Sequence, residues 1–263
     1  MPGVEGKVVL ITGASRGIGK ATARLFSAKG AHVMAVARSS EETVLLAGKT
    51  SSLPYEYFAA DLSTEEGCQV AVDETVRRFN GRQIDILVCN HGIGSAHEKP
   101  IHELENVAMW NESINTNLHG PFYLTRLVMS GMVQHKYGRC VYTSSTAATD
   151  AGAEYGAVGY NASKAGLLGL MRSVCRDGGI YNITANAVLP GWVKTEMADK
   201  SAQAEAVQNN TTAEQVWEER AALYPPKRVV TQEEVAHTIL FLASEESSGV
   251  SGEEIRVSLG CPL

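Results

Sequence analysis

The sequence predicts a single α/β domain built on a doubly wound parallel sheet of about seven strands. Short apolar runs rich in β-branched residues alternate with longer amphipathic segments along nearly the whole chain. A glycine-rich turn joins the first apolar run to the first amphipathic segment, and no linker, repeat or low-complexity tract interrupts the alternation. Near-continuous apolar strands alternating with helices are typical of a parallel sheet covered on both faces, so we expect a Rossmann-like arrangement over residues 1–263.

The predicted elements follow from the period of the apolar residues. Strands are expected at 7–12, 32–37, 55–60, 84–89, 138–144, 182–188 and 254–258. Helices are expected at 17–29, 65–79, 111–135, 160–176 and 232–243. In the first helix, for example, apolar residues recur at the spacing of one helical face, at Ile18, Ala21, Leu25 and Ala28.

Residues 196–230 break this rhythm. The segment is polar and helix-prone, with Pro225 and Pro226 near its end. Insertions of this length in a compact domain are usually functional loops or disordered segments. We interpret it as a helical lid over a substrate site.

Composition excludes several classes of function. The 263 residues include 23 Lys and Arg against 29 Asp and Glu, a net charge of −6, and a nucleic-acid binder would need a basic face. The five cysteines are widely spaced with no C-x-x-C pair, so we expect neither disulfides nor a metal site. No apolar run approaches the ~18 residues of a membrane span, and the N-terminus has no signal pattern. A cytoplasmic protein without nucleic-acid or membrane partners is predicted.

The glycine-rich turn Thr12–Gly19, TGASRGIG, is a candidate phosphate-binding loop. Gly13, Gly17 and Gly19 allow a tight turn and let a pyrophosphate approach the N-terminus of the first helix, where unpaired N–H groups favour anions.

The end of the second strand can discriminate between NAD and NADP. It has Arg38 and Ser39 where an acid would bind a ribose 2′-hydroxyl, and the first acid is Glu41. Arg16 in the glycine turn is a second cation, so NADP(H) is favoured over NAD(H). The alternative is that Arg38 is only a solvated strand end.

Tyr160 and Lys164 stand at i and i+4 on one predicted helix face. An adjacent cation stabilises a phenolate, which makes a tyrosine of ordinary pKa about 10 useful in acid–base catalysis. Ser144 and Ser145 stand at the end of the fifth strand, at the sheet edge where ligands bind in open α/β sheets.

With these motifs the chain resembles the short-chain dehydrogenase/reductase family over essentially its full length. The matching stretches are 12–19, Asp61-Leu62, Asn90-His91-Gly92, 117–120, Ser144-Ser145, 160–164 (YNASK) and 190–195. The resemblance implies an oxidoreductase that moves a hydride between a nicotinamide cofactor and a small-molecule carbonyl or alcohol substrate. It also implies a homotetramer or homodimer built from the helices at 111–135 and 160–176.

The resemblance implies a role for each catalytic residue. Tyr160 would be the general acid, and Lys164 would lower its pKa and hold the nicotinamide ribose. Ser145 would bind the substrate oxygen; Ser144 is the alternative, and the second serine is favoured. Asn117 would kink its helix and position a water that links Lys164 to solvent.

The resemblance also implies a set of cofactor contacts. Asp61 and Leu62 would contact the adenine, Asn90 would lie beside the cofactor, and Val193 and Thr195 would hold the nicotinamide carboxamide. The complete set is Gly13, Ser15, Arg16, Gly17, Ile18, Gly19, Arg38, Ser39, Asp61, Leu62, Asn90, Gly92, Tyr160, Lys164, Val193 and Thr195.

Two departures from the family pattern concern the substrate side. His91 replaces an alanine, so an imidazole either borders the pocket or only caps its strand. The interval from Ser145 to Tyr160 is about two residues longer than usual, which places extra residues near Tyr155. Ser145, Tyr155, Tyr160, Trp192 and Met197 are the candidate substrate contacts.

We therefore expect an NADP(H)-dependent oxidoreductase that interconverts a ketone and a secondary alcohol. An apolar wall for a larger ketone is expected from lid residues, namely Trp192, Met197, Trp217, Leu223 and Tyr224; alternatively, Trp217 and Leu223 only pack the lid onto the body. Three other functions remain open: a 3-oxoacyl thioester ketoreductase of the fatty-acid or polyketide type, a catalytically silent NADP-binding regulator, and a sugar-nucleotide epimerase or dehydratase.

Overall fold

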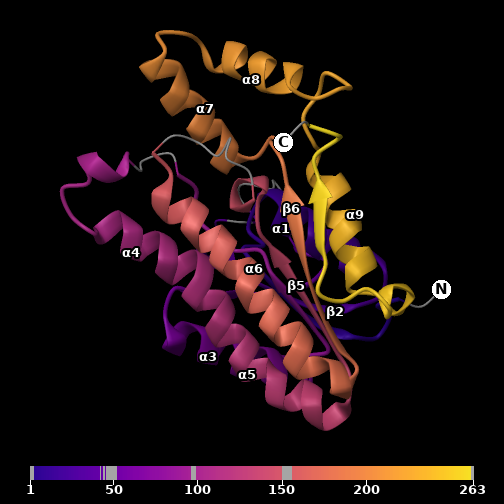
Figure 1. Ribbon diagram of the computed structural model, residues 1–263. Coiled ribbons are helices and arrows are strands. Elements are labelled where there is room, and N and C mark those ends of the chain that lie inside the picture. Colours follow the sequence, from indigo (N-terminus) through magenta and orange to yellow (C-terminus); the bar gives the residue numbers. More distant parts are fainter. Residues whose placement is uncertain are drawn as a thin grey trace.

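A seven-stranded parallel sheet forms the centre of the computed structural model, which describes residues 3–41, 43, 45, 52–95, 99–149 and 156–261 (Figure 1). The strand order is β3-β2-β1-β4-β5-β6-β7, and every pairing is parallel. The strands are β1 Val8–Thr12, β2 His32–Ala37, β3 Glu56–Ala59, β4 Ile86–Cys89, β5 Gly138–Thr143, β6 Ile183–Pro190 and β7 Glu254–Val257. The predicted fold class is confirmed, and a strand lies at each predicted run.

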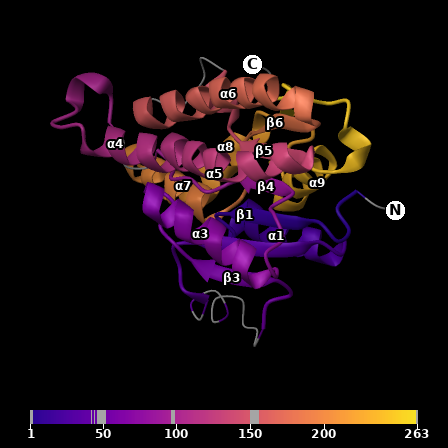
Figure 2. The same cartoon turned by 90° about the horizontal axis from the view of Figure 1, so that it is seen from below.

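Helices cover both faces of the sheet (Figure 2). On one face, α3 (Glu65–Arg78), α5 (Gly120–His135) and α6 (Val158–Gly178) pack on a core that includes Leu124 and Leu167. On the other face, α1 (Gly17–Ala28) and α9 (Gln232–Leu242) pack through residues such as Phe26 and Ile239. Strands β1 and β4 are buried along their whole length, which explains why they are apolar without alternation.

The helix predicted over 111–135 is interrupted. Helix α4 covers Ala108–Ile114, a π turn covers Asn115–His119, and α5 follows from Gly120. Apolar spacing alone does not reveal this π turn because the turn occupies only five residues within a longer periodic segment. Such turns are frequent at functional sites, and Asn117 lies within this one.

Residues 196–230 form two helices, as the composition predicted. Helix α7 is Glu196–Gln208 and α8 is Ala213–Ala222, each capped by a threonine, Thr195 or Thr212. The two helices share a small apolar cluster that includes Ala202 and Val216. They lie at the end of the molecule toward which the strands point (Figure 1). A lid at this end faces the edge of the sheet where ligands bind.

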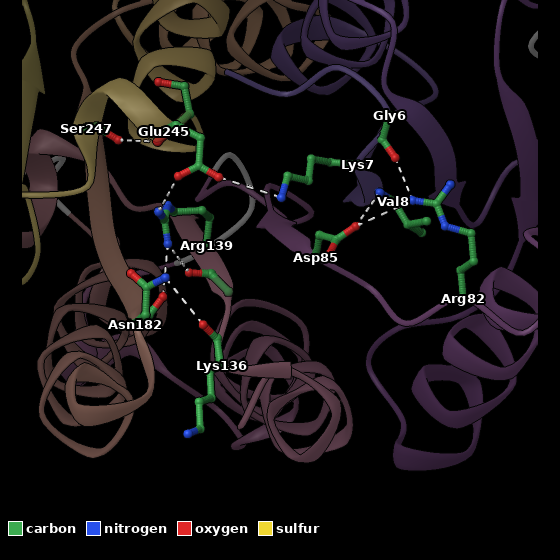
Figure 3. Close-up of polar contacts among 12 residues, drawn as sticks. Gly6, Lys7, Val8, Arg82, Asp85, Lys136, Arg139, Asn182, Glu245 and Ser247 are labelled. Atoms are coloured by element: carbon green, nitrogen blue, oxygen red, sulfur yellow. Dashed lines mark hydrogen bonds and ion pairs between the residues drawn. The ribbon is translucent and has the colours of Figure 1, made fainter. Parts of the chain in front are cut away.

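The opposite end of the sheet is fixed by ionic contacts (Figure 3). The Arg139 side chain is fully buried and bonds to the main-chain oxygen of Asn182 at 3.1 Å and to the Glu245 carboxylate at 3.3 Å. Lys7 pairs with the same carboxylate at 3.6 Å. Because a buried charge is stable only when it is paired, these contacts hold β1, β5 and β6 together far from the lid.

Candidate functional site

A cleft of about 310 Å³ lies at the carboxyl ends of the strands, beneath α7. Its walls come from the loops after β1, β2, β3, β4, β5 and β6, and from α6 and α7. The sheet order reverses direction at β1, whose neighbours are β2 and β4, and ligands of open α/β sheets bind at such a switch point.

Most of the predicted site residues line this one cleft. They are Gly13, Ser15, Arg16, Gly17, Ile18, Arg38, Ser39, Asp61, Leu62, Asn90, Gly92, Ser145, Tyr160, Lys164, Trp192, Val193, Thr195 and Met197. Gly19 and Asn117 lie behind its wall, and Tyr155 lies outside the described residues. Segments from six separate loops thus meet at one place, as the motifs predicted.

The glycine turn is packed too closely for side chains. A Cβ on Gly13 would lie 2.7 Å from the Cα of His91, and one on Gly19 would lie 2.3 Å from the Gly13 carbonyl oxygen. Gly17 has a φ of +58°, which glycine adopts without strain. Gly19 therefore shapes the turn from behind instead of touching a ligand.

The N-terminus of α1 is suited to an anion. No side chain caps it and its first turn holds no acid, and the glycine turn that leads into it lines the cleft. The first N–H groups of α1 thus have no capping side chain, and the helix dipole favours a negative group beside them.

Two exposed cations, Arg16 and Arg38, line the cleft at the ends of the first two strands. Within the part of the chain that the structure describes, neither forms an ion pair. Nearby, the Asp61 carboxylate accepts from the main-chain N–H of Ser63 at 3.0 Å and from its hydroxyl at 2.8 Å. These bonds hold the pKa of Asp61 below its usual range, so it is anionic at neutral pH.

The loop after β4 is held against β1 by Thr12. Its hydroxyl donates to the carbonyl of Val88 at 3.2 Å and accepts from the N–H of Asn90 at 2.9 Å. The Nδ1 atom of His91 lies 2.7 Å from the same hydroxyl, and His91 also lines the cleft. The imidazole thus both binds the strand end and borders the pocket. Burial lowers the pKa of His91 to about 3, so the ring is neutral.

Lys164 and Tyr160 project from α6 into the cleft, with the lysine Nζ 5.8 Å from the centroid of the tyrosine ring. Nζ donates to the carbonyl of Thr143 at 2.9 Å. Burial is the main cause that lowers the pKa of Lys164 to about 8. A cation is therefore held beside the phenol at neutral pH.

The two serines after β5 have different surroundings. The Ser144 hydroxyl is buried and donates to the main-chain carbonyl of Lys164 at 2.8 Å. The Ser145 hydroxyl accepts from the N–H of Ala147 at 3.2 Å and lines the cleft. With the Ser144 hydroxyl engaged by α6, Ser145 is the better placed to bind a substrate oxygen.

Asn117 is fully buried in the π turn. Its Oδ1 accepts from the N–H of Ile93 at 2.8 Å, and its Nδ2 donates to the Ile93 carbonyl and the Ser163 hydroxyl, both at 3.1 Å. A Cβ on Gly92 would lie 3.0 Å from Oδ1 of Asn117 and 3.4 Å from Nζ of Lys164. Asn117 therefore joins the loop after β4 to α6 from behind the cleft.

The lid supplies only part of the predicted apolar wall. Trp192 and Met197 line the cleft, with Met197 over Gly94. The prediction is wrong for the other three residues. Trp217 bonds through Nε1 to Asp199 at 3.0 Å and packs the two lid helices together. Tyr224 is buried, and its hydroxyl accepts from the main-chain N–H of Trp192. Leu223 is exposed.

Sequence reasoning missed several cleft residues, which include Ile93, Ser95, Thr116 and Thr143. For Ile93 and Ser95, the position in the loop after buried strand β4 was the available signal, since such loops meet at one sheet edge. Neither a metal-binding cluster of three or more His, Cys, Asp or Glu nor a helix able to span a membrane occurs within the described ranges.

Comparison with known proteins gives consistent matches. Residues 13–261 match the family model described as enoyl-(acyl carrier protein) reductase. The 3-oxoacyl-[acyl-carrier-protein] reductase FabG of Thermotoga maritima is 34% identical over 262 residues, covering 98% of both proteins. Levodione reductase superposes with a TM-score of 0.88 at 30% identity, covering 98% of each chain. A single-residue variant of actinorhodin polyketide ketoreductase with NADPH superposes with a TM-score of 0.89 at 28% identity, covering 97% of each chain.

Proposed function

The chain belongs to the short-chain dehydrogenase/reductase family, and from this premise we propose that it is an NADP(H)-dependent oxidoreductase interconverting a ketone and a secondary alcohol. The observation that carries the proposal is the meeting of Tyr160, Lys164 and Ser145 at the wall of a cleft whose other end is an uncapped helix N-terminus. A proton donor, a cation and a hydrogen-bond donor in one cleft are what carbonyl reduction requires.

Each residue has a step to perform. The Ser145 hydroxyl donates to the substrate carbonyl oxygen and orients it, and the Tyr160 hydroxyl transfers its proton to that oxygen. The Lys164 ammonium stabilises the phenolate that remains. Asn117, through Ile93 and Ser163, fixes the loop and helix that hold these groups, and we propose that it also positions the water that resupplies the proton. When bound, NADP(H) supplies the hydride.

The residues at the other end of the cleft fit NADP(H). The N–H groups of α1 suit the pyrophosphate, and Arg16 and Arg38, without ion-pair partners in the described ranges, suit a 2′-phosphate. Asp61 and Leu62 would hold the adenine, while Val193 and Thr195 would hold the carboxamide. The superposed polyketide ketoreductase was crystallised with NADPH, which supports the same choice.

A second candidate is reduction of a 3-oxoacyl thioester. It is favoured by the FabG relatives, which span the whole chain at about one-third identity. The same catalytic groups would serve this reaction, since a 3-oxoacyl thioester also presents a ketone. The two candidates differ only in what the lid end of the cleft accepts.

The test is the initial rate of NADPH and NADH oxidation against a graded series of ketones, including 3-oxoacyl thioesters. Turnover faster with NADPH is expected. Tyr160→Phe is expected to reduce turnover by about a hundred- to ten-thousandfold while NADPH binding is retained. NADPH binding without turnover of any ketone would instead favour a catalytically silent regulator, and full activity of Tyr160→Phe would contradict the assigned acid.

A further inference from the structure

Arg220 of α8 is 4% exposed, although it is a charged residue on the shorter lid helix. Its guanidinium carbon lies 3.5 Å from the centroid of the Trp192 ring and 5.1 Å from that of Trp217. The two indoles meet edge to face at 6.3 Å. A guanidinium over an indole face is among the stronger cation–π arrangements, and more so away from water.

The polar atoms of Arg220 are directed to α7. Its nitrogens donate to the Ala198 carbonyl at 3.3 Å, to the Ser201 hydroxyl at 3.0 Å and to the Glu205 carboxylate at 2.7 Å. Ala198 and Ser201 line the cleft, as does Trp192. One buried side chain therefore connects the loop after β6 with α7, and both of these elements form the lid end of the cleft.

Trp192 is held from a second direction. Its main-chain N–H donates to the hydroxyl of Tyr224 at 2.6 Å, and a Cβ on Gly191 would lie 2.5 Å from the same oxygen. The backbone and one face of the indole are thus fixed, and Trp192, which is half-buried, lines the cleft. The wall it presents, with Met197 and Gly94, is apolar and formed in advance.

The lid end offers no counter-ion for an anion. Among the described residues that line the cleft, the cations are Arg16 and Arg38 at the cofactor end and Lys164 beside Tyr160, while the lid contributes Glu196. The charge of Arg220 is already matched by Glu205. Helices α7 and α8 contain six acids and two bases, so a phosphorylated carrier would meet repulsion.

We propose that Trp192 and α7 form a fixed wall for an uncharged ketone with a bulky apolar group, and that Arg220 is the positioning residue that holds this wall. The inference rests on the proposed reductase function and names its substrate class. It also distinguishes the two candidates of the preceding section, because a thioester of coenzyme A or of a carrier protein brings phosphate charges to the lid.

The first experiment measures steady-state kinetics with NADPH and a small and a bulky ketone. Arg220→Ala is expected to raise KM for the bulky ketone about tenfold, with KM for NADPH unchanged and a smaller effect on the small ketone. Arg220→Lys, which keeps the charge but not the planar stack, is expected to lie between wild type and Arg220→Ala. Arg228→Ala, which breaks an exposed pair with Glu234, is the matched control with unchanged kinetics.

The second experiment compares a 3-oxo ester with the 3-oxo acid of the same chain length, and an N-acetylcysteamine thioester with the coenzyme A thioester. The uncharged member of each pair is expected to have at least about tenfold higher kcat/KM. Glu205→Gln removes the carboxylate that pairs with Arg220, so it should reduce the ratio of kcat/KM for the ester to kcat/KM for the acid. This variant also tests the proposal if the Arg220→Ala protein does not fold.

Failure of this inference can be told apart from failure of the proposed function. If no ketone is reduced with NADPH, the function itself is wrong. If ketones are reduced but the charged partner of each pair is preferred, the substrate class is wrong. If the Arg220→Ala protein is folded and its KM rises equally for the small and the bulky ketone, Arg220 is not a positioning residue for the wall. The same conclusion follows if its KM for NADPH rises as much as its KM for the bulky ketone.

Discussion

The side-chain ammonium of Lys164 donates to the main-chain carbonyl of Thr143 across 2.9 Å, while the carbonyl of Lys164 accepts from the Ser144 hydroxyl at 2.8 Å. Through its side chain and its main chain, Lys164 thus ties this turn of α6 to the end of β5. The ammonium is therefore in place before any ligand arrives. This preorganisation requires a charge to be buried, with Lys164 only 5% exposed.

That burial predicts a stability cost with a definite pH dependence. The pKa of Lys164 is lowered from 10.5 to about 8. Between these values the unfolded chain binds more protons than the folded one, so the free energy of unfolding should rise with pH through this range. At pH 7, Lys164→Met should be inactive yet more stable than wild type by about 1–2 kcal/mol in urea unfolding.

The control for this prediction is Lys200→Met, because Lys200 is exposed on α7. It should leave both the stability and its pH dependence unchanged. A Lys164→Met protein that is less stable than wild type at pH 7 would mean that the bond to Thr143 outweighs the cost of burying the charge.

The fold was predictable because the sheet is buried on both faces. Strand β2, His32–Ala37, has the bounds that the sequence predicted, and every residue after His32 is buried and apolar, since nothing in a doubly covered strand needs to be polar. The helix over 111–135 was mispredicted in detail because its π turn around Asn117 depends on bonds to Ile93 and Ser163, which are distant in sequence. Periodicity contains no information on such contacts.

The same difference between local spacing and distant contacts explains why some site residues were predicted correctly and others were not. Glycines, Tyr160 and Lys164 were found because their spacing reflects local geometry along one helix or turn. Trp217 and Tyr224 were misassigned because an aromatic residue in a lid can face either the cleft or the neighbouring helix, and only tertiary contacts decide which. The stacking of Arg220 on Trp192 joins residues of two separate elements, so no local pattern revealed it.

His91 predicts a second pH effect, in acid. Burial lowers its pKa from 6.5 to about 3, so between these values the unfolded chain binds the additional proton. The contribution of the neutral His91 ring to the free energy of unfolding is therefore present above pH 6.5 and is lost as the pH falls toward 3. His91→Asn keeps an amide that can donate to Thr12 but has no group that titrates. Between pH 6.5 and 4.5 its free energy of unfolding should fall by about 2 kcal/mol less than that of the wild type. Equal acid sensitivity of the two proteins in urea unfolding would contradict a neutral buried ring.

Arg38 predicts the cofactor preference. Arg38→Asp removes a cation from the cleft and introduces an acid that can accept from a ribose 2′-hydroxyl and repels a 2′-phosphate. The ratio of kcat/KM for NADPH to that for NADH should fall by about a hundredfold. Arg24→Asp on α1, exposed and away from the cleft, should leave the ratio unchanged. An unchanged ratio in Arg38→Asp would mean that Arg38 is a solvated strand end.

Exposed apolar side chains on α4 and α5 lead us to predict that the protein self-associates. Phe122 of α5 is 45% exposed and Trp110 of α4 is 36% exposed, and these helices lie beside α6 (Figure 1). Exposed large apolar side chains are typical of subunit contacts, in keeping with the homodimer or homotetramer that the family resemblance implies. Phe122→Glu should shift the mass measured by light scattering toward the monomer, because it places a charge in the apolar contact. Val207→Glu, 82% exposed on α7, should leave the mass unchanged. A wild-type protein that is monomeric at working concentration would contradict the prediction directly.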